Sequence, residues 1–333
     1  MNASESCRSG VFQFQSTLLI IGAMFSLLIL SLWSVTIGTF QLSLIEMINN
    51  PNVREVVLVS RLPRTFAVII AGAVLGMLGC LSQTVMNNAF AEPTTLGTPQ
   101  GIALGLLVAS IIFPEQSLLL HMLMGCGAGL SSLLFLNWLI KRLRLSDSMQ
   151  LPLIGLVYSA ILGAGATFLA FEYDRLQTLM SWLNGDFSTV LADNYELLWG
   201  AFFTGLAVYL AASYFSLLAV GQTLASGLGV PYQRIAFLAM VMVALGTSLV
   251  VVTVGMISFL GLVIPNIVRQ YVGDNLTHSL PWSGWLGAFL LLSCDILGRI
   301  LGSPIELPAS VVFGTFAAGL FLIMLWKGAD DEC

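Results

Sequence analysis

The chain has 333 residues, of which 57% are hydrophobic and 9% are charged, and its formal net charge is −5. A soluble chain of this length would carry charge on about a quarter of its residues, so the composition excludes an ordinary soluble enzyme or nucleic-acid-binding domain. The charges separate nine uncharged runs of 20 residues or more: 9–45, 65–91, 93–114, 116–140, 148–171, 197–233, 235–268, 275–294 and 307–326. A charge at the centre of a bilayer costs about 2.5–3.5 kcal/mol, so these runs predict helices that cross a membrane.

In chain order, the runs predict an all-α membrane protein with about ten helices in one transmembrane domain, 1–333. The expected helices are 16–38, 62–86, 96–112, 117–140, 151–171, 194–215, 235–254, a short one from 258, 282–300 and 307–326. The first run exceeds the core of a signal peptide and lacks an A-x-A site, so we expect a retained helix. An amphipathic stretch at 41–60 precedes the second helix. The run 235–268 is too long for one helix, and we expect it to break at Gly255.

The basic residues indicate the orientation, because cytoplasmic loops are enriched in Lys and Arg. The cluster Lys141-Arg142-x-Arg144 follows the fourth helix and favours a model with both termini inside. In that model the cytoplasmic set is Arg8, Lys141, Arg142, Arg144, Arg234, Arg269 and Lys327, and the outer set is Arg54, Arg61, Arg64, Arg175 and Arg299. The bias is small, and basic residues kept outside often have a function there.

Glycines predict where helices approach closely, because a residue without a side chain lets two backbones meet. Such positions are Gly72-x-x-x-Gly76 with Gly79, then Gly125, Gly127 and Gly129, then Gly163 and Gly165. These patterns are common in helical membrane bundles, so they indicate packing and not chemistry.

No enzymatic motif is present. The two lysines, Lys141 and Lys327, do not follow a phosphate-loop glycine pattern, so any ATP hydrolysis must occur on another subunit. The two histidines, His121 and His278, are far apart and form no H-E-x-x-H motif. The five cysteines are scattered without metal spacing, and small buried hydrophobes are the expected role. We therefore expect a transporter or channel, with no cofactor and no metal site.

An ion-coupled secondary transporter would need an ionisable group at membrane depth. Asp295 is the best candidate, but Arg299 lies four residues further along the same helix face. An ion pair between positions i and i+4 explains both residues, and we favour it over a proton site.

The segment 216–270 carries the most specific motifs. It contains Gly221-Gln-Thr-Leu-Ala225-Ser-Gly-Leu228-Gly229-Val230 and then Phe259-Leu-Gly261-Leu262-Val-Ile-Pro265-Asn-Ile-Val-Arg269. Further motifs are Arg61-Leu62-Pro63-Arg64-Thr65, Asn88-Ala-Phe-Ala91-Glu92-Pro93-x-x-Leu96-Gly97, and the tail Asp295…Arg299…Glu306-Leu307-Pro308. Over about 55–326 the chain resembles the permeases of the iron-siderophore and cobalamin importers, the type II ABC importers with ten helices per subunit.

The resemblance implies a role for the glycine-punctuated segment. In the family it forms two short coupling helices that rest on the ATP-binding subunit, here at Gly221, Ala225, Leu228, Gly229 and Val230. Two short helices at the cytoplasmic face also fit the apolar spacing of the segment.

The resemblance also implies two other sites. Arg61, Arg64 and Arg299 would receive carboxylates of a substrate-binding protein at the outer face, although interfacial anchoring is an alternative for Arg61 and Arg64. Asn88 and Phe90 would narrow the cytoplasmic end of the pathway; Ala89 stands where the family has proline.

The implied partners are ATP-binding subunits, a substrate-binding protein, a second permease subunit (the same chain or a related one) and membrane lipid, in the inner membrane of a bacterial cell. The segment Ser181-Trp182-Leu-Asn-Gly185-Asp186-Phe187 resembles one found especially in siderophore permeases. We therefore expect a ferric siderophore, such as a catecholate, as cargo, with haem or cobalamin as the alternative.

Overall fold

The computed structural model describes residues 3–37, 51–143, 150–191, 195–302 and 306–330, and within these ranges it is helical without strands. The helices are α1 (Ala3–Thr36), α3 (Pro51–Val56), α4 (Leu62–Met86), α5 (Thr98–Ile112), α6 (Leu118–Leu143), α7 (Gln150–Glu172), α8 (Leu176–Leu183), α9 (Glu196–Leu210), α10 (Ala212–Phe215), α11 (Gln222–Gly227), α12 (Tyr232–Val254), α13 (Leu260–Val272), α14 (Leu276–Leu301) and α15 (Ala309–Asp330). Shorter helical turns are η1 (Val57–Arg61), η2 (Pro93–Leu96) and η3 (Ser216–Val220). The predicted all-α class is confirmed.

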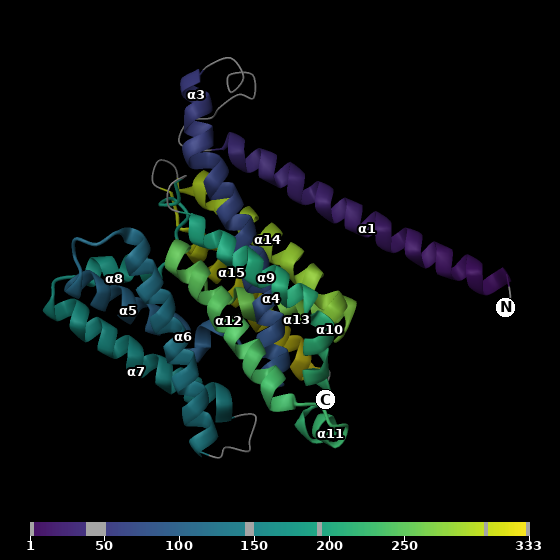
Figure 1. Cartoon of the computed structure of the whole chain (residues 1–333). Helices are drawn as coiled ribbons and strands as arrows, with labels where there is room; N and C mark the ends of the chain where they lie inside the picture. Colours follow the sequence, from purple (N-terminus) through teal and green to yellow (C-terminus); the bar gives the residue numbers. More distant parts are fainter. Residues whose placement is uncertain (1–2, 38–50, 144–149, 192–194, 303–305, 331–333) are drawn as a thin grey trace.

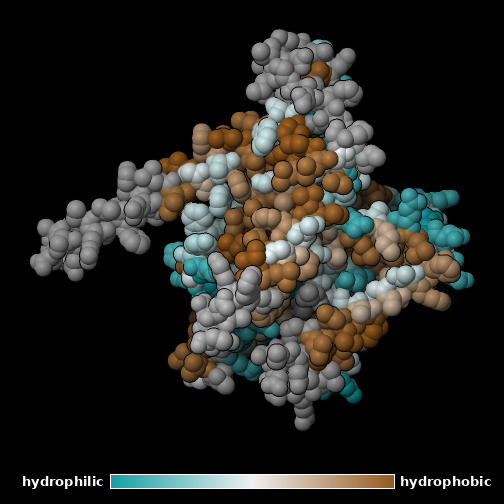
Figure 2. Space-filling model, turned by 180° about the vertical axis from the view of Figure 1, so that it is seen from behind, coloured by the Kyte–Doolittle hydropathy of each residue, from teal (hydrophilic) through white to brown (hydrophobic). Residues whose placement is uncertain are grey.

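Six helices of the described chain are long and apolar enough to cross a membrane: α1, the rod containing α4, α6, α7, α12 and α14. Another span is bent by 63° between α9 and the segment Ala212–Val220, and α5, α13 and α15 are shorter. These ten segments correspond in order to the ten predicted ones. Figure 2 shows apolar side chains over much of the visible flank, as contact with lipid requires.

The second helix begins earlier than the sequence predicts. Residues 41–50 of the expected amphipathic stretch lie outside the described residues, but α3 and η1 continue directly into α4 as one rod (Figure 1). Pro63 has no N–H and interrupts the regular ladder of hydrogen bonds. The N–H of Leu62 bonds instead to the carbonyl of Val57, five residues back, which makes η1 a π-helical turn.

The glycines of α4 let this helix occupy the centre of the bundle, against α13 and α14. A Cβ atom on Gly72 would lie 2.6 Å from a backbone carbonyl oxygen of α14, and Gly76 and Gly79 are equally close to backbone. Their predicted packing role is confirmed. Gly127 and Gly165 have no such neighbour among the described residues, so their small size is not used within this part of the chain.

The break predicted at Gly255 is present. α12 ends at Val254, and Gly255 has φ +83°, in the region that favours glycine. A non-helical stretch follows to Phe259, whose φ of +67° is uncommon for a bulky residue, and α13 begins at Leu260. The long run therefore makes one full helix and one short helix.

The polar ends of the bundle separate two groups of candidate residues. The helix α3 and the start of α4 lie at one end, and α11 lies at the other (Figure 1). We call them the arginine end and the coupling end. α1 slants away from the bundle toward its N-terminus and contacts α14, where the Trp285 indole N–H donates to the Ala23 carbonyl at 2.8 Å.

Candidate functional site

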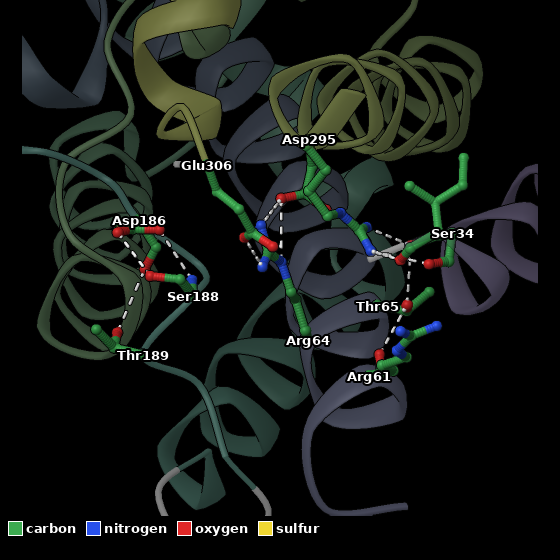
Figure 3. Close-up of polar contacts among 11 residues, drawn as sticks. Ser34, Arg61, Arg64, Thr65, Asp186, Ser188, Thr189, Asp295 and Glu306 are labelled. Carbon is green, nitrogen blue, oxygen red and sulfur yellow. Dashed lines mark hydrogen bonds and ion pairs between the residues drawn. The ribbon is translucent and has the colours of Figure 1, made fainter. Parts of the chain in front are cut away.

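Ion pairs join two helices at the arginine end (Figure 3). Asp295 of α14 is only 1% exposed, and its Oδ1 lies 2.8 Å from Nη2 of Arg64 on α4. Its Oδ2 accepts from Arg299, so the predicted pair between positions i and i+4 is confirmed. Arg64 also pairs with Glu306, which precedes α15. We call Arg61, Arg64, Asp295, Arg299 and Glu306 the arginine cluster.

The arginine cluster also holds the C-terminal end of α1. Guanidinium groups of Arg61 and Arg299 donate to backbone carbonyl oxygens of residues 34–37 at distances of 2.8–3.1 Å. The Ser34 and Thr65 hydroxyl groups share a hydrogen bond of 3.0 Å (Figure 3). The last carbonyls of a helix have no partner within it and carry a partial negative charge. The two arginines therefore cap α1 and fasten it to α4 and α14.

The structure places all three predicted docking arginines together, but it buries them: Arg61, Arg64 and Arg299 are 9%, 9% and 6% exposed. Their docking role stays a prediction. The most accessible partner in the cluster is Glu306, whose side chain is 24% exposed. Sequence reasoning missed Glu306 and Arg64 as partners of one network, because 242 positions separate them.

At the coupling end, the glycine-punctuated motif has a clear local explanation. Gly229 has φ +77°, and the N–H of Val230 donates to the carbonyl of Ala225 at 3.0 Å. This is the Schellman arrangement, in which a left-handed glycine ends a helix and its neighbours satisfy the last carbonyls. Gly221, with φ +85°, makes a second turn before α11. The sequence thus gives two short helical pieces, η3 and α11, separated by turns.

The five predicted coupling residues do not share one environment. Leu228 is 78% exposed, and a Cβ on Gly229 or Gly221 would meet nothing within 4 Å. Ala225, in contrast, is 2% exposed and faces its own chain. The large exposed apolar side chains of this segment are Val220, Leu224 and Leu228. Ala225 can therefore support the segment from behind, whereas the leucines form its outer surface.

The candidate gate follows the end of α4. Asn88 accepts the Phe90 N–H through Oδ1 at 2.8 Å, which fixes a tight turn. The Phe90 side chain is 52% exposed, and its ring meets that of Phe321 on α15 edge-to-face at 6.0 Å. The Ala89 carbonyl accepts from the Asn266 side chain of α13 at 2.9 Å. The two gate residues thus lie in one turn that α13 and α15 contact.

Glu92 ends this turn and is a functional candidate that sequence reasoning did not single out. It is 3% exposed, and its carboxyl group is hydrogen-bonded by the Thr94 side chain and the Phe259 backbone. Burial raises the pKa of Glu92 to about 7. The sequence feature that could have identified Glu92 is its position as a single acidic residue between the long uncharged runs 65–91 and 93–114.

The segment 181–187, which resembles one found in siderophore permeases, lies at the arginine end and borders a cavity of about 470 Å³. The polar lining of the cavity comes from Ser181, Asn184, Asp186, Thr189 and Thr253, and its aromatic lining comes from Trp182. Asp186 accepts from the Ser188 backbone and hydroxyl groups at 2.8 and 2.7 Å (Figure 3). Within the described residues no group of three His, Cys, Asp or Glu could hold a metal ion.

Comparisons with known proteins agree over nearly the whole chain. Residues 26–327 match the model of the FecCD transport family. The chain is 39% identical to the petrobactin import system permease protein YclN of Bacillus subtilis, over 90% of this chain and 96% of that protein. It is 36% identical to the ferric-anguibactin transport system permease protein FatD of Vibrio anguillarum, over 82% of this chain and 87% of that protein. It is 30% identical to the vitamin B12 import system permease protein BtuC of Vibrio cholerae, over 81% of this chain and 82% of that protein.

A solved structure described as an ABC transporter of the metal-chelate type, in an inward-facing conformation, superposes with a TM-score of 0.82. It is 26% identical, and the match covers 93% of this chain and 99% of the other. The chain belongs to the FecCD transport family and is a multi-pass permease subunit of a type II ABC importer.

Proposed function

We propose that this permease carries a ferric siderophore across the inner membrane of a bacterial cell into the cytoplasm. The single observation that carries the proposal is the similarity, over 90% of the chain, to a permease named for petrobactin import. A second relative is named for ferric anguibactin. The cavity beside residues 181–189 supports the proposal, since a few polar side chains and Trp182 within an otherwise apolar lining suit a polar ring-containing chelate.

Iron would enter already wrapped by its chelator, so the permease itself needs no iron ligands. A pathway for such cargo must be wide and must bind weakly, because tight binding inside the membrane would slow release. We therefore assign selection of the cargo mainly to a separate binding protein and not to the helices of this chain.

ATP hydrolysis is assigned to separate ATP-binding subunits that contact the segment 216–230. Val220, Leu224 and Leu228 form an exposed apolar surface there, supported by the buried Ala225. The helix α11 lies between the glycine turns at Gly221 and Gly229 and contacts η3 and α12, so a push from the ATP-binding subunit on α11 would be transmitted to these two elements. A second permease subunit, identical or related, completes the pathway.

The binding protein is assigned to the arginine end. Because the arginines are buried, an incoming carboxylate would reach the arginine cluster by replacing Glu306 on Arg64. Guanidinium can grip either carboxylate with two N–H groups, so the exchange keeps the charge of Arg64 balanced. This exchange would make docking sensitive to ionic strength.

Cobalamin is the second candidate cargo, because a vitamin B12 import permease is 30% identical to this chain; haem remains a further alternative. A deletion strain grown under iron limitation, supplied with one chelate at a time, separates these cargoes. We expect lost growth on one ferric siderophore and normal cobalamin and haem use. Undiminished growth on every siderophore, with lost cobalamin or haem uptake, would contradict the siderophore assignment and leave the importer class intact.

A further inference from the structure

The non-helical stretch between α12 and α13 is bonded to a segment at the arginine end. The backbone N–H of Gly185 donates to the carbonyl of Met256, and the N–H of Asp186 donates to the carbonyl of Val254, both at 2.9 Å. The two backbones lie so close that a Cβ on Gly185 would sit 2.7 Å from the Met256 carbonyl oxygen. A Cβ on Gly255 would likewise sit 2.7 Å from the Asn184 carbonyl oxygen. Segment 184–186 cannot shift without moving residues 254–256.

The same stretch is bonded to the candidate gate on its other side. The Phe259 backbone is hydrogen-bonded to the carboxyl group of Glu92. About two turns into α13, the Asn266 side chain donates to the Ala89 carbonyl at 2.9 Å. A Cβ on Gly261 would lie 2.8 Å from the Pro93 ring, so the first turn of α13 is packed directly on the gate turn. Residues 88–93 are thus held at both ends by α13.

The segment between these two attachments has little freedom. Only residues 255–259 are non-helical, and two of the five, Gly255 and Phe259, have positive φ. α13 is fixed against α4, where the buried Gln83 side chain donates to the Leu262 carbonyl at 3.2 Å. Close-packed backbone transmits a displacement instead of absorbing it. A movement at either attachment is therefore expected to reach the other.

We propose that residues 254–266, which we call the bridging segment, link segment 184–186 at the arginine end to the turn at residues 88–93, so that a displacement of one of these two segments displaces the other. The proposal rests on the importer function proposed above, since it assigns a shared conformational change to the two ends. It makes Gly185, Gly255 and Asn266 positioning residues of that change.

Amide hydrogen exchange, measured by mass spectrometry on the full importer complex in nanodiscs, tests the link from both sides. Gly185→Ala forces a displacement at the arginine end, and we expect about fivefold faster exchange in residues 88–93, which it does not touch. One kcal/mol of local stability corresponds to a factor of about five. Asn266→Ala removes one bond at the gate, and we expect faster exchange in residues 184–190.

Gly127→Ala is the matched control, because a Cβ there meets nothing within 4 Å, and we expect no change at either site. If the Gly185→Ala variant does not insert into the membrane, amide exchange in residues 184–190 of the Asn266→Ala variant alone tests the link. Exchange that changes only around the substituted residue would overturn the proposed link. The readout needs no cargo, so it is independent of siderophore uptake, which is measured separately on the unaltered complex.

Discussion

Neutralising Asp295 is expected to cost more stability than any other single charge removal at the arginine end. The side chain is 1% exposed, and its two oxygens bind the guanidinium groups of Arg64 and Arg299. Asp295→Asn keeps the shape but leaves two buried cations with one amide oxygen between them. Breaking a buried pair costs about 3–5 kcal/mol. At about 2 °C per kcal/mol for a chain of this size, the unfolding midpoint should fall by about 6–10 °C.

Thermal unfolding of the purified permease in detergent measures this loss. Glu306→Gln is the control, because Glu306 pairs with the same Arg64 but its side chain is 24% exposed. A partly exposed pair contributes about 1 kcal/mol or less. Equal, small shifts for both variants would show that the burial of Asp295 does not make its ion pairs more stabilising than that of Glu306. In the double variant with Arg299→Gln, the loss should be smaller than the sum of the two single losses.

Three further predictions follow from burial and packing. Leu228→Arg changes a side chain that is 78% exposed, so the permease should fold normally and lose ATP-driven uptake, whereas Ala225→Glu should lower its thermal stability; normal uptake by Leu228→Arg would place the coupling surface elsewhere. Gly76→Ala drives a Cβ into a carbonyl of α14 and should lower the unfolding midpoint, whereas Gly127→Ala should not. Burial raises the pKa of Glu92 from 4.5 to about 7, so the folded state binds the proton more tightly than the unfolded state. The free energy of unfolding should therefore fall as pH rises from 4.5 to about 7. The same dependence on pH in a Glu92→Gln variant would show that Glu92 is not its cause.

Hydrophobic run length was enough to predict the class and the order of the ten helices, because the cost of placing charge in a bilayer acts on the sequence directly. The break at Gly255 was predictable for the same reason: the run was too long for one helix and contained a glycine. The start of the second helix was not predictable. It depends on a π turn at residues 57–61 that accommodates Pro63, and no residue before this turn stops the helix.

The sequence motifs identified the candidate site residues, but they did not predict how deeply these residues are buried or which partners they contact. Arg64 and Arg299 were expected at an outer surface, and their burial depends on the carboxylate of Asp295 and on the carbonyls of α1, which only the tertiary structure brings together. Likewise, the sequence does not distinguish the buried Ala225 from the exposed Leu228, because both belong to one motif. Glu92 was overlooked because its importance depends on the packing of α13 over the gate turn.

The most direct test of the central assignment is uptake of a radiolabelled ferric siderophore by vesicles that contain the permease, its ATP-binding subunits and its binding protein. We expect uptake that requires ATP in the compartment where the ATP-binding subunits lie and that persists when a proton uncoupler is added. Uptake that proceeds without ATP in energised vesicles, and stops with the uncoupler, would contradict the assignment as an ATP-driven importer.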